Sequence, residues 1–150
     1  MRSLITTLAL LGACTTTTQL MDPPVPPPTP ECTTNADCGD DVCGRDAFCS
    51  APSDVRTVHV SWTINHQAAD ATTCAPSPIF DVEFQTDPIS ADRGGTIDFA
   101  RVPCDEGLFT IDRIPTKYWV AGAKTSPTGG SSGMYVPIDE TNSAKIDLPY

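Results

Sequence analysis

The chain has 150 residues, with 9 lysines and arginines against 19 aspartates and glutamates, a formal net charge of −10 and a sequence pI near 4.3. This length suits one modest domain with appendages and excludes a large multidomain enzyme. So acidic a chain offers no basic surface to neutralise phosphates, and nucleic acid is therefore not an expected partner. We interpret the acidity as a feature that favours solubility. Composition alone indicates no molecular activity.

Residues 1–13 have the pattern of an export signal. Arg2 is followed by an apolar run over residues 4–11, and the small pair Gly12-Ala13 precedes Cys14. The run is shorter than the ~20 residues that a helix needs to cross a bilayer, and no later segment is longer or more apolar. The sequence therefore predicts a signal peptide over 1–13 and no transmembrane helix.

Leu11-Gly12-Ala13-Cys14 resembles the lipobox of bacterial lipoproteins. The resemblance implies that Cys14 becomes the first mature residue and carries a thioether-linked diacylglycerol, usually with a third, palmitate-type acyl chain. Each buried CH₂ adds ~0.8 kcal/mol of membrane affinity, so several chains anchor the protein stably. Because Thr15 and not Asp follows the cysteine, the resemblance implies the outer membrane, with the protein facing the periplasm or the surface. An ordinary cleaved signal with a passive thiol is the alternative.

The chain contains seven cysteines, an odd number for an exported protein. If Cys14 carries lipid, six remain, and these can form three disulfides in an oxidising compartment. The six are Cys32, Cys38, Cys43, Cys49, Cys74 and Cys104.

A segment rich in threonine and proline follows over residues 14–31. Proline fixes φ and supplies no amide donor, so we expect a disordered polyproline II tether that spans ~30 Å over its proline-dense part. The tether would hold the following residues away from a membrane. A proline-rich ligand for an SH3-like groove is the alternative, but such partners are not expected outside a bacterial cell.

Residues 32–49 form a four-cysteine module with the spacing C-x5-C-x4-C-x5-C and mostly turn-forming residues between the sulfurs. The module holds too few apolar residues for a core, so disulfides must stabilise it. Three pairings of the four cysteines are possible, and spacing alone does not choose among them. A resemblance to small two-bridge extracellular modules, in which crossed pairing is common, implies Cys32–Cys43 and Cys38–Cys49.

Two metal-binding alternatives for the module have weaker support. Zinc would find four thiols, but the C-x2-C hairpins of zinc fingers are absent and an exported chain meets oxidants. Calcium could use the four aspartates between the cysteines, yet the EF-hand spacing and terminal Glu are missing. A solvated acidic loop is the simpler interpretation, and we expect no metal and no cofactor.

From residue 55 to 150 the pattern changes to short alternating runs separated by turns. Val58, Val60 and Trp62 share one face while His59 and Ser61 share the other, which is typical of a half-buried strand. No part of residues 55–150 has a pattern that predicts a helix. Seven strands are expected in a mostly β chain with a β-sandwich over 55–150, at residues 57–64, 80–85, 96–102, 108–112, 118–123, 134–138 and 144–148.

The stretch 104–120, in which a strand leads through Ile114-Pro115 into Tyr118-x-Val120, resembles prealbumin-like sandwiches grouped with carboxypeptidase regulatory-like and Cna B-type domains. The resemblance implies a fold used for adhesion, spacing and ligand display more often than for catalysis. The family commonly has Gly between the proline and the tyrosine, whereas this chain has Thr116-Lys117. We expect a Cys74–Cys104 disulfide to staple the sandwich, because these two cysteines remain after the module is paired.

Candidate catalytic groups are sparse. His59 and His66 are seven residues apart and do not make a metal pair on an extended strand. Ser61 lies near His59, but no G-x-S-x-G elbow or phosphate-binding glycine loop occurs. The sequence therefore predicts no enzyme and no catalytic residue.

The sequence supports three functions. The leading hypothesis is a lipid-anchored cell-envelope protein that displays a non-catalytic β-sandwich interaction module. A second is carbohydrate or peptide binding around Trp119 and Tyr135, whose rings could stack on a ligand. Packing of both aromatics in a core or over a sheet edge is the simpler interpretation, so we assign no binding residues. A third is inhibition of a hydrolase or protease by the cysteine module.

Overall fold

The computed structural model describes residues 31–86, 95–125 and 133–149. These residues form mostly strands and no α-helix, which confirms the mostly β prediction, and none of their helical turns could span a bilayer. The predicted signal peptide, Cys14 and all but the last residue of the predicted tether lie outside the described residues. The longer strands are β3 (Val55–Ile64), β5 (Ile79–Gln85), β6 (Thr96–Pro103), β7 (Leu108–Pro115), β8 (Val120–Thr125), β9 (Gly133–Pro137) and β10 (Ser143–Leu148).

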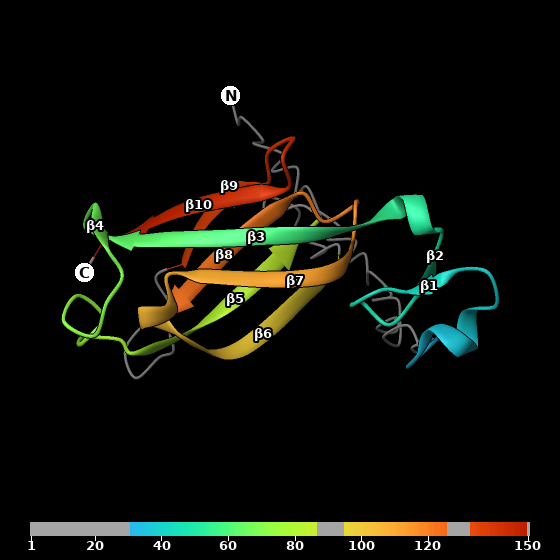
Figure 1. Ribbon diagram of the computed structural model, residues 1–150, viewed down its shortest axis with the longest axis horizontal. Helices are drawn as coiled ribbons and strands as arrows, with labels where there is room; N and C mark the ends of the chain where they lie inside the picture. Colours follow the sequence, from blue (N-terminus) through green and yellow to red (C-terminus); the bar gives the residue numbers. More distant parts are fainter. Residues whose placement is uncertain (1–30, 87–94, 126–132, 150) are drawn as a thin grey trace, which may run out of the picture.

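The shorter elements lie at the two ends of the sandwich. They are the 3₁₀ turns η1 (Asn35–Cys38), η2 (Pro52–Asp54) and η3 (Cys104–Glu106), and the two-residue strands β1 (Val42–Cys43), β2 (Cys49–Ser50) and β4 (Gln67–Ala68). β1 and β2 pair with each other inside the four-cysteine module, and β4 pairs with the end of β3. In Figure 1 the module lies beyond the start of β3, and β4 lies at the opposite end.

Two sheets pack face to face. One contains β10, β3 and β7, with β3 parallel to β10 and antiparallel to β7; the other has the order β6-β5-β8-β9. The alternation predicted for β3 holds, because Val58, Val60, Trp62 and Ile64 are all buried between the sheets. The Trp62 ring meets the Phe80 ring edge to face, with centroids 4.8 Å apart, so aromatic packing adds to the burial of apolar area.

Each of the seven predicted strands has a counterpart, and the bounds differ where local geometry intervenes. β8 begins at Val120 and not at Tyr118, since the Tyr118 amide donates to the Pro115 carbonyl at 3.0 Å in a turn. β7 extends to Pro115 through an irregularity opposite Arg56 and Val58. There Arg113 has a positive φ of 56°, and such bulges redirect side chains out of the regular alternation.

Candidate functional site at the junction of module and sandwich

The four-cysteine module is held by two crossed disulfides. Cys32 is bonded to Cys43 and Cys38 to Cys49, with Cα atoms 5.8 Å and 5.5 Å apart, which is the pairing that the resemblance implied. The Asp37 carboxylate accepts the Thr33 and Thr34 amides, each at 2.8 Å, and these hydrogen bonds lower the pKa of Asp37. Covalent bonds and a turn network thus take the place of a hydrophobic core.

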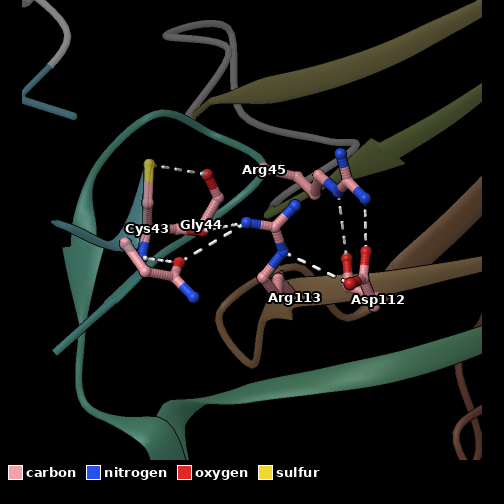
Figure 2. Close-up of polar contacts among 6 residues, drawn as sticks. Cys43, Gly44, Arg45, Asp112 and Arg113 are labelled. Carbon is pink, nitrogen blue, oxygen red and sulfur yellow. Dashed lines mark hydrogen bonds and ion pairs between the residues drawn. The ribbon is translucent and has the colours of Figure 1, made fainter. Parts of the chain in front are cut away.

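The module docks on the redirected end of β7. The Arg45 amide donates to the Arg113 carbonyl at 3.0 Å, and the Arg45 guanidinium makes an ion pair with Asp112. Arg113 reaches back, with one terminal nitrogen 3.4 Å from the Cys43 carbonyl and 3.5 Å from Asn35 Oδ1. Figure 2 shows this interlock of two arginines, one from each side of the junction. The hydrogen bond from Arg45 is the main reason that the pKa of Asp112 is lowered.

A buried carboxylate completes the junction. The Asp46 side chain is only 4% exposed and lies 2.7 Å from Lys117 Nζ, a residue of the sandwich. It also accepts the Phe48 amide at 3.3 Å and the Tyr118 hydroxyl at 3.5 Å. Lys117 lies over the Phe48 and Tyr118 rings, 5.7 Å and 5.4 Å from their centroids, so its charge is satisfied by both a carboxylate and two π faces.

Gly44 lies close to the junction contacts. A Cβ on Gly44 would lie 2.7 Å from Asp46 Oδ1 and 3.1 Å from Pro115 Cγ, so a larger residue would displace the Asp46 carboxylate and press against the sandwich. Asp46, Lys117 and Gly44 therefore act together where the module contacts the sandwich.

Ionisation of Tyr118 at the junction should lower the stability of the protein at alkaline pH. Burial first, and then the Asp46 carboxylate, raise the pKa of Tyr118 from 10.0 to about 12. Below pH 10 the phenol is neutral in both states, whereas above pH 10 the unfolded chain ionises first, so stability is lost as the pH rises towards 12. Between pH 9 and pH 11 we expect Tyr118 to account for a loss of about 1 kcal/mol in the free energy of unfolding.

Urea unfolding at the two pH values measures this loss, with Tyr118→Phe as the matched control. The variant lacks the ionisable group, so its stability should fall less than that of the wild type over the same interval. Equal losses in the two proteins would show that ionisation of Tyr118 does not cause the loss of stability at alkaline pH.

The opposite end of the sandwich is stapled by the predicted Cys74–Cys104 disulfide, with Cα atoms 5.7 Å apart. Trp62 Nε1 donates to the Cys104 carbonyl at 2.7 Å, which ties this end to the core. A shallow hollow of about 310 Å³ opens beside the staple; it is lined by Ile64, Asn65, Gln67, Thr72, Thr73 and Pro76.

A second buried carboxylate lies on the outer face of the β6-β5-β8-β9 sheet. Glu83 is only 2% exposed, makes an ion pair with Lys124, and accepts hydrogen bonds from Gln85 and, at 3.2 Å, from the Tyr135 hydroxyl. The Tyr135 ring covers Gly122, where a Cβ would come within 2.3 Å of a ring carbon. The ring can lie over the sheet only because β8 has a glycine at this position.

The structure separates the candidate catalytic residues. His59 Nδ1 is 3.0 Å from the Thr110 hydroxyl, and the Ser61 hydroxyl donates to the Ala144 carbonyl at 3.5 Å, so they do not pair as base and nucleophile. His66 lies by Asp147, with Nδ1 2.8 Å from a carboxylate oxygen.

The two aromatics predicted as ligand contacts have different environments. Trp119 is 46% exposed and lies just before β8, between the buried residues Tyr118 and Val120. The alternation that would have turned it outward does not apply, because Tyr118 lies in a turn and Val120 lies outside the core cluster. Tyr135 is half-buried over Gly122. Sequence reasoning missed both buried carboxylates: Asp46 lies in a polar turn, and Glu83 lies between apolar residues of a strand, where a polar side chain ordinarily faces water.

Comparisons of the chain with protein-family models, with curated proteins and with solved structures found no match.

Proposed function

We propose that this chain is a lipid-anchored protein of the bacterial cell envelope that displays a non-catalytic, prealbumin-like β-sandwich for interaction. The observation that carries the proposal is the pairing of sulfur: all six cysteines of the described residues are in disulfides, which leaves Cys14 as the one cysteine of the chain free for another fate. Three disulfides in one chain are typical of an oxidising compartment outside the cytosol. The lipobox-like pattern around Cys14 supplies that other fate.

The arrangement of the described residues supports display. The chain enters at the module, which is docked at the start of β3, while β4 lies at the far end (Figure 1). The Cys74–Cys104 staple lies at that far end too, because Cys104 begins η3 just before β7, whose first residue pairs with Ser61 near the end of β3. A tether that precedes the module would therefore hold the sandwich by one end and present the other. The ion pair between Asp46 and Lys117 supports that orientation.

A ligand-binding function has support from the exposed indole of Trp119. An indole that is 46% exposed offers a flat apolar face for a sugar or a peptide. If this function is correct, Trp119→Ala abolishes binding in a glycan array or a pull-down, whereas Tyr135→Ala weakens it less because that ring is half-buried on the sheet. Binding that survives both substitutions would remove the ligand from these residues.

Substitution of the anchor tests the leading proposal. Cys14→Ser removes the acylated sulfur, so we expect the protein to move from the detergent phase to the aqueous phase in phase partitioning of cell extracts. Intact-mass measurement of the wild type should show acyl mass, and measurement of the variant should show none. A variant that stays in the detergent phase, or a wild type without acyl mass, would refute the lipid anchor.

A further inference from the structure

β7 is an open edge of its sheet. Among the described residues it pairs only with β3, and Figure 1 shows no further strand of this sheet beyond it. The Trp62 amide donates to the Gly107 carbonyl at 3.1 Å, so the alternation of an antiparallel pair directs the amides and carbonyls of Leu108 and Thr110 away from β3. The His59 amide, opposite Thr110, accordingly bonds on the other side of β3. The free edge of β7 thus offers the donors and acceptors that another strand would need.

The other long edge strands carry features that hinder pairing with a further strand. β6 has a bulge at Arg101, whose φ is 64° and where the pairing with β5 is irregular. β9 ends at Pro137, and β10 carries the charged residues Lys145 and Asp147. Bulges, prolines and charges are the usual protection of an edge strand against other chains. Residues 108–111 of β7 have none of them, since their sequence is Leu-Phe-Thr-Ile.

Apolar side chains accompany the free backbone of β7. Leu108 is 48% exposed, and Phe109 and Ile111 are partly exposed although they pack against the core. The Phe109 ring lies 5.3 Å from the Phe99 ring of β6, the edge strand of the other sheet on the same side of the sandwich. A strand added to β7 would cover these side chains, so burial of apolar area would add to the backbone hydrogen bonds.

The charges at the two ends of this edge favour a second copy of the chain as the added strand. Asp105 and Glu106 are exposed just before β7, and neither makes an ion pair with a described residue. At the other end, Arg45 and Arg113 both lie against the single carboxylate of Asp112. The edge is therefore acidic at its start and basic at its end. An antiparallel copy reverses this order, so that the acidic end of each copy meets the basic end of the other.

We propose that two copies of this chain pair through β7, antiparallel about a two-fold axis at Phe109. Leu108 of each copy then lies opposite Thr110 of the other, and each of these pairs exchanges both of its backbone hydrogen bonds. The pairing ends at Asp112, because Arg45 Nε already donates to the Asp112 carbonyl at 3.3 Å. The same surface is used by both copies, so the assembly closes as a dimer in which the two β10-β3-β7 sheets become one. The proposal does not depend on the lipid anchor.

Amide hydrogen exchange followed by NMR tests the pairing on the full-length chain with Cys14→Ser, which removes the anchor. The amides of Phe109 and Ile111 face β3, so their protection should depend little on protein concentration. The amides of Leu108 and Thr110 should exchange more slowly as the concentration rises, in step with dimer formation in sedimentation equilibrium. A chain that stays monomeric, or a dimer that leaves the exchange of Leu108 and Thr110 unchanged, would overturn the proposal.

A pair of lysine variants locates the interface. Leu108→Lys places a charge on the open edge and should raise the dissociation constant of the dimer at least about tenfold. Met134→Lys makes the same change at a 41% exposed residue of β9 and should alter that constant less than about twofold. Both variants keep residues 1–13, so any association through that segment is the same in each, and circular dichroism checks their strands. Equal dissociation constants for the two variants would rule out pairing through β7.

Reversal of the acidic end tests the antiparallel arrangement. Asp105→Lys/Glu106→Lys should weaken the dimer, because the acidic end would then repel Arg45 and Arg113 of the other copy. The matched control is Asp40→Lys/Asp41→Lys, which changes the net charge equally at two exposed residues of the module and should not weaken it. Sedimentation equilibrium measures both constants. A dimer weakened equally by the two double variants would contradict the antiparallel pairing.

Discussion

Replacing Cys74 and Cys104 together by alanine should lower the free energy of unfolding of the sandwich by about 3–4 kcal/mol, because their disulfide closes a loop with a sequence separation of 30. The closed loop contains β5 and β6, which supply half of the second sheet. Alanine leaves no hydroxyl at two positions that are at most 2% exposed, so the loss reports the crosslink and not a buried polar group. For a domain of this size the melting temperature should fall by on the order of 15 °C.

Denaturant unfolding followed by fluorescence measures this loss. In a Trp119→Phe background the emission comes from Trp62, whose indole bonds to the Cys104 carbonyl next to the staple. Cys38→Ala/Cys49→Ala is the matched control, since it opens a loop with a separation of only 11 in the module, and its effect on the sandwich transition should be smaller. A loss below about 1 kcal/mol in the Cys74/Cys104 variant would contradict a stapling role.

Lys124→Met should lower the free energy of unfolding by about 3 kcal/mol at neutral pH, because it leaves the Glu83 carboxylate buried without its cation. This value is at the low end for a broken buried pair, since the Lys124 side chain is one-third exposed. Methionine keeps the length and most of the volume of lysine, so packing against Gly133 and the sheet is preserved. Thermal and urea unfolding both measure the loss.

The double variant Lys124→Met/Glu83→Gln distinguishes the destabilisation caused by an unpaired charge from that caused by lost packing. The neutral amide needs no cation and can still accept the Tyr135 hydroxyl, so the double variant should recover most of the lost stability. Lys145→Met, on the exposed side of β10, is the control and should change stability by less than about 0.5 kcal/mol. A Lys124→Met variant as stable as this control would show that Glu83 does not depend on its partner.

The strands could be predicted because each one covers a shared core from one side. Apolar residues at every second position predict which face of a strand is buried. Val58, Val60, Trp62 and Ile64 give this pattern in β3, and Phe80, Val82 and Phe84 give it in β5. The period of two is a property of extended backbone itself, so it is present in the sequence whatever the partner strand is. The strand ends were less accurate at 115–120, where a turn and a bulge interrupt the alternation.

The junction could not be predicted, because the contacts between the module and the sandwich join residues far apart in the chain. Arg45 and Asp112 are 67 residues apart, and Asp46 and Tyr118 are 72 apart. Taken alone, Asp46 is one acidic residue in a polar loop, and Lys117 is a turn residue. Glu83 likewise occupies an outward position in an alternating strand, and only Tyr135, Lys124 and Gln85 together make it buried.

The amino-acid sequence by itself determined where the strands form, which cysteines are available for disulfides and the leader-like pattern before Cys14. These features depend on periodicity and composition, which can be read from neighbouring positions. Only the tertiary structure determined which strands pair, how the module docks on the sandwich and which carboxylates are buried. Those outcomes depend on distances between residues remote in the chain, and burial of a charge is favourable only where the folded backbone brings its partner within reach.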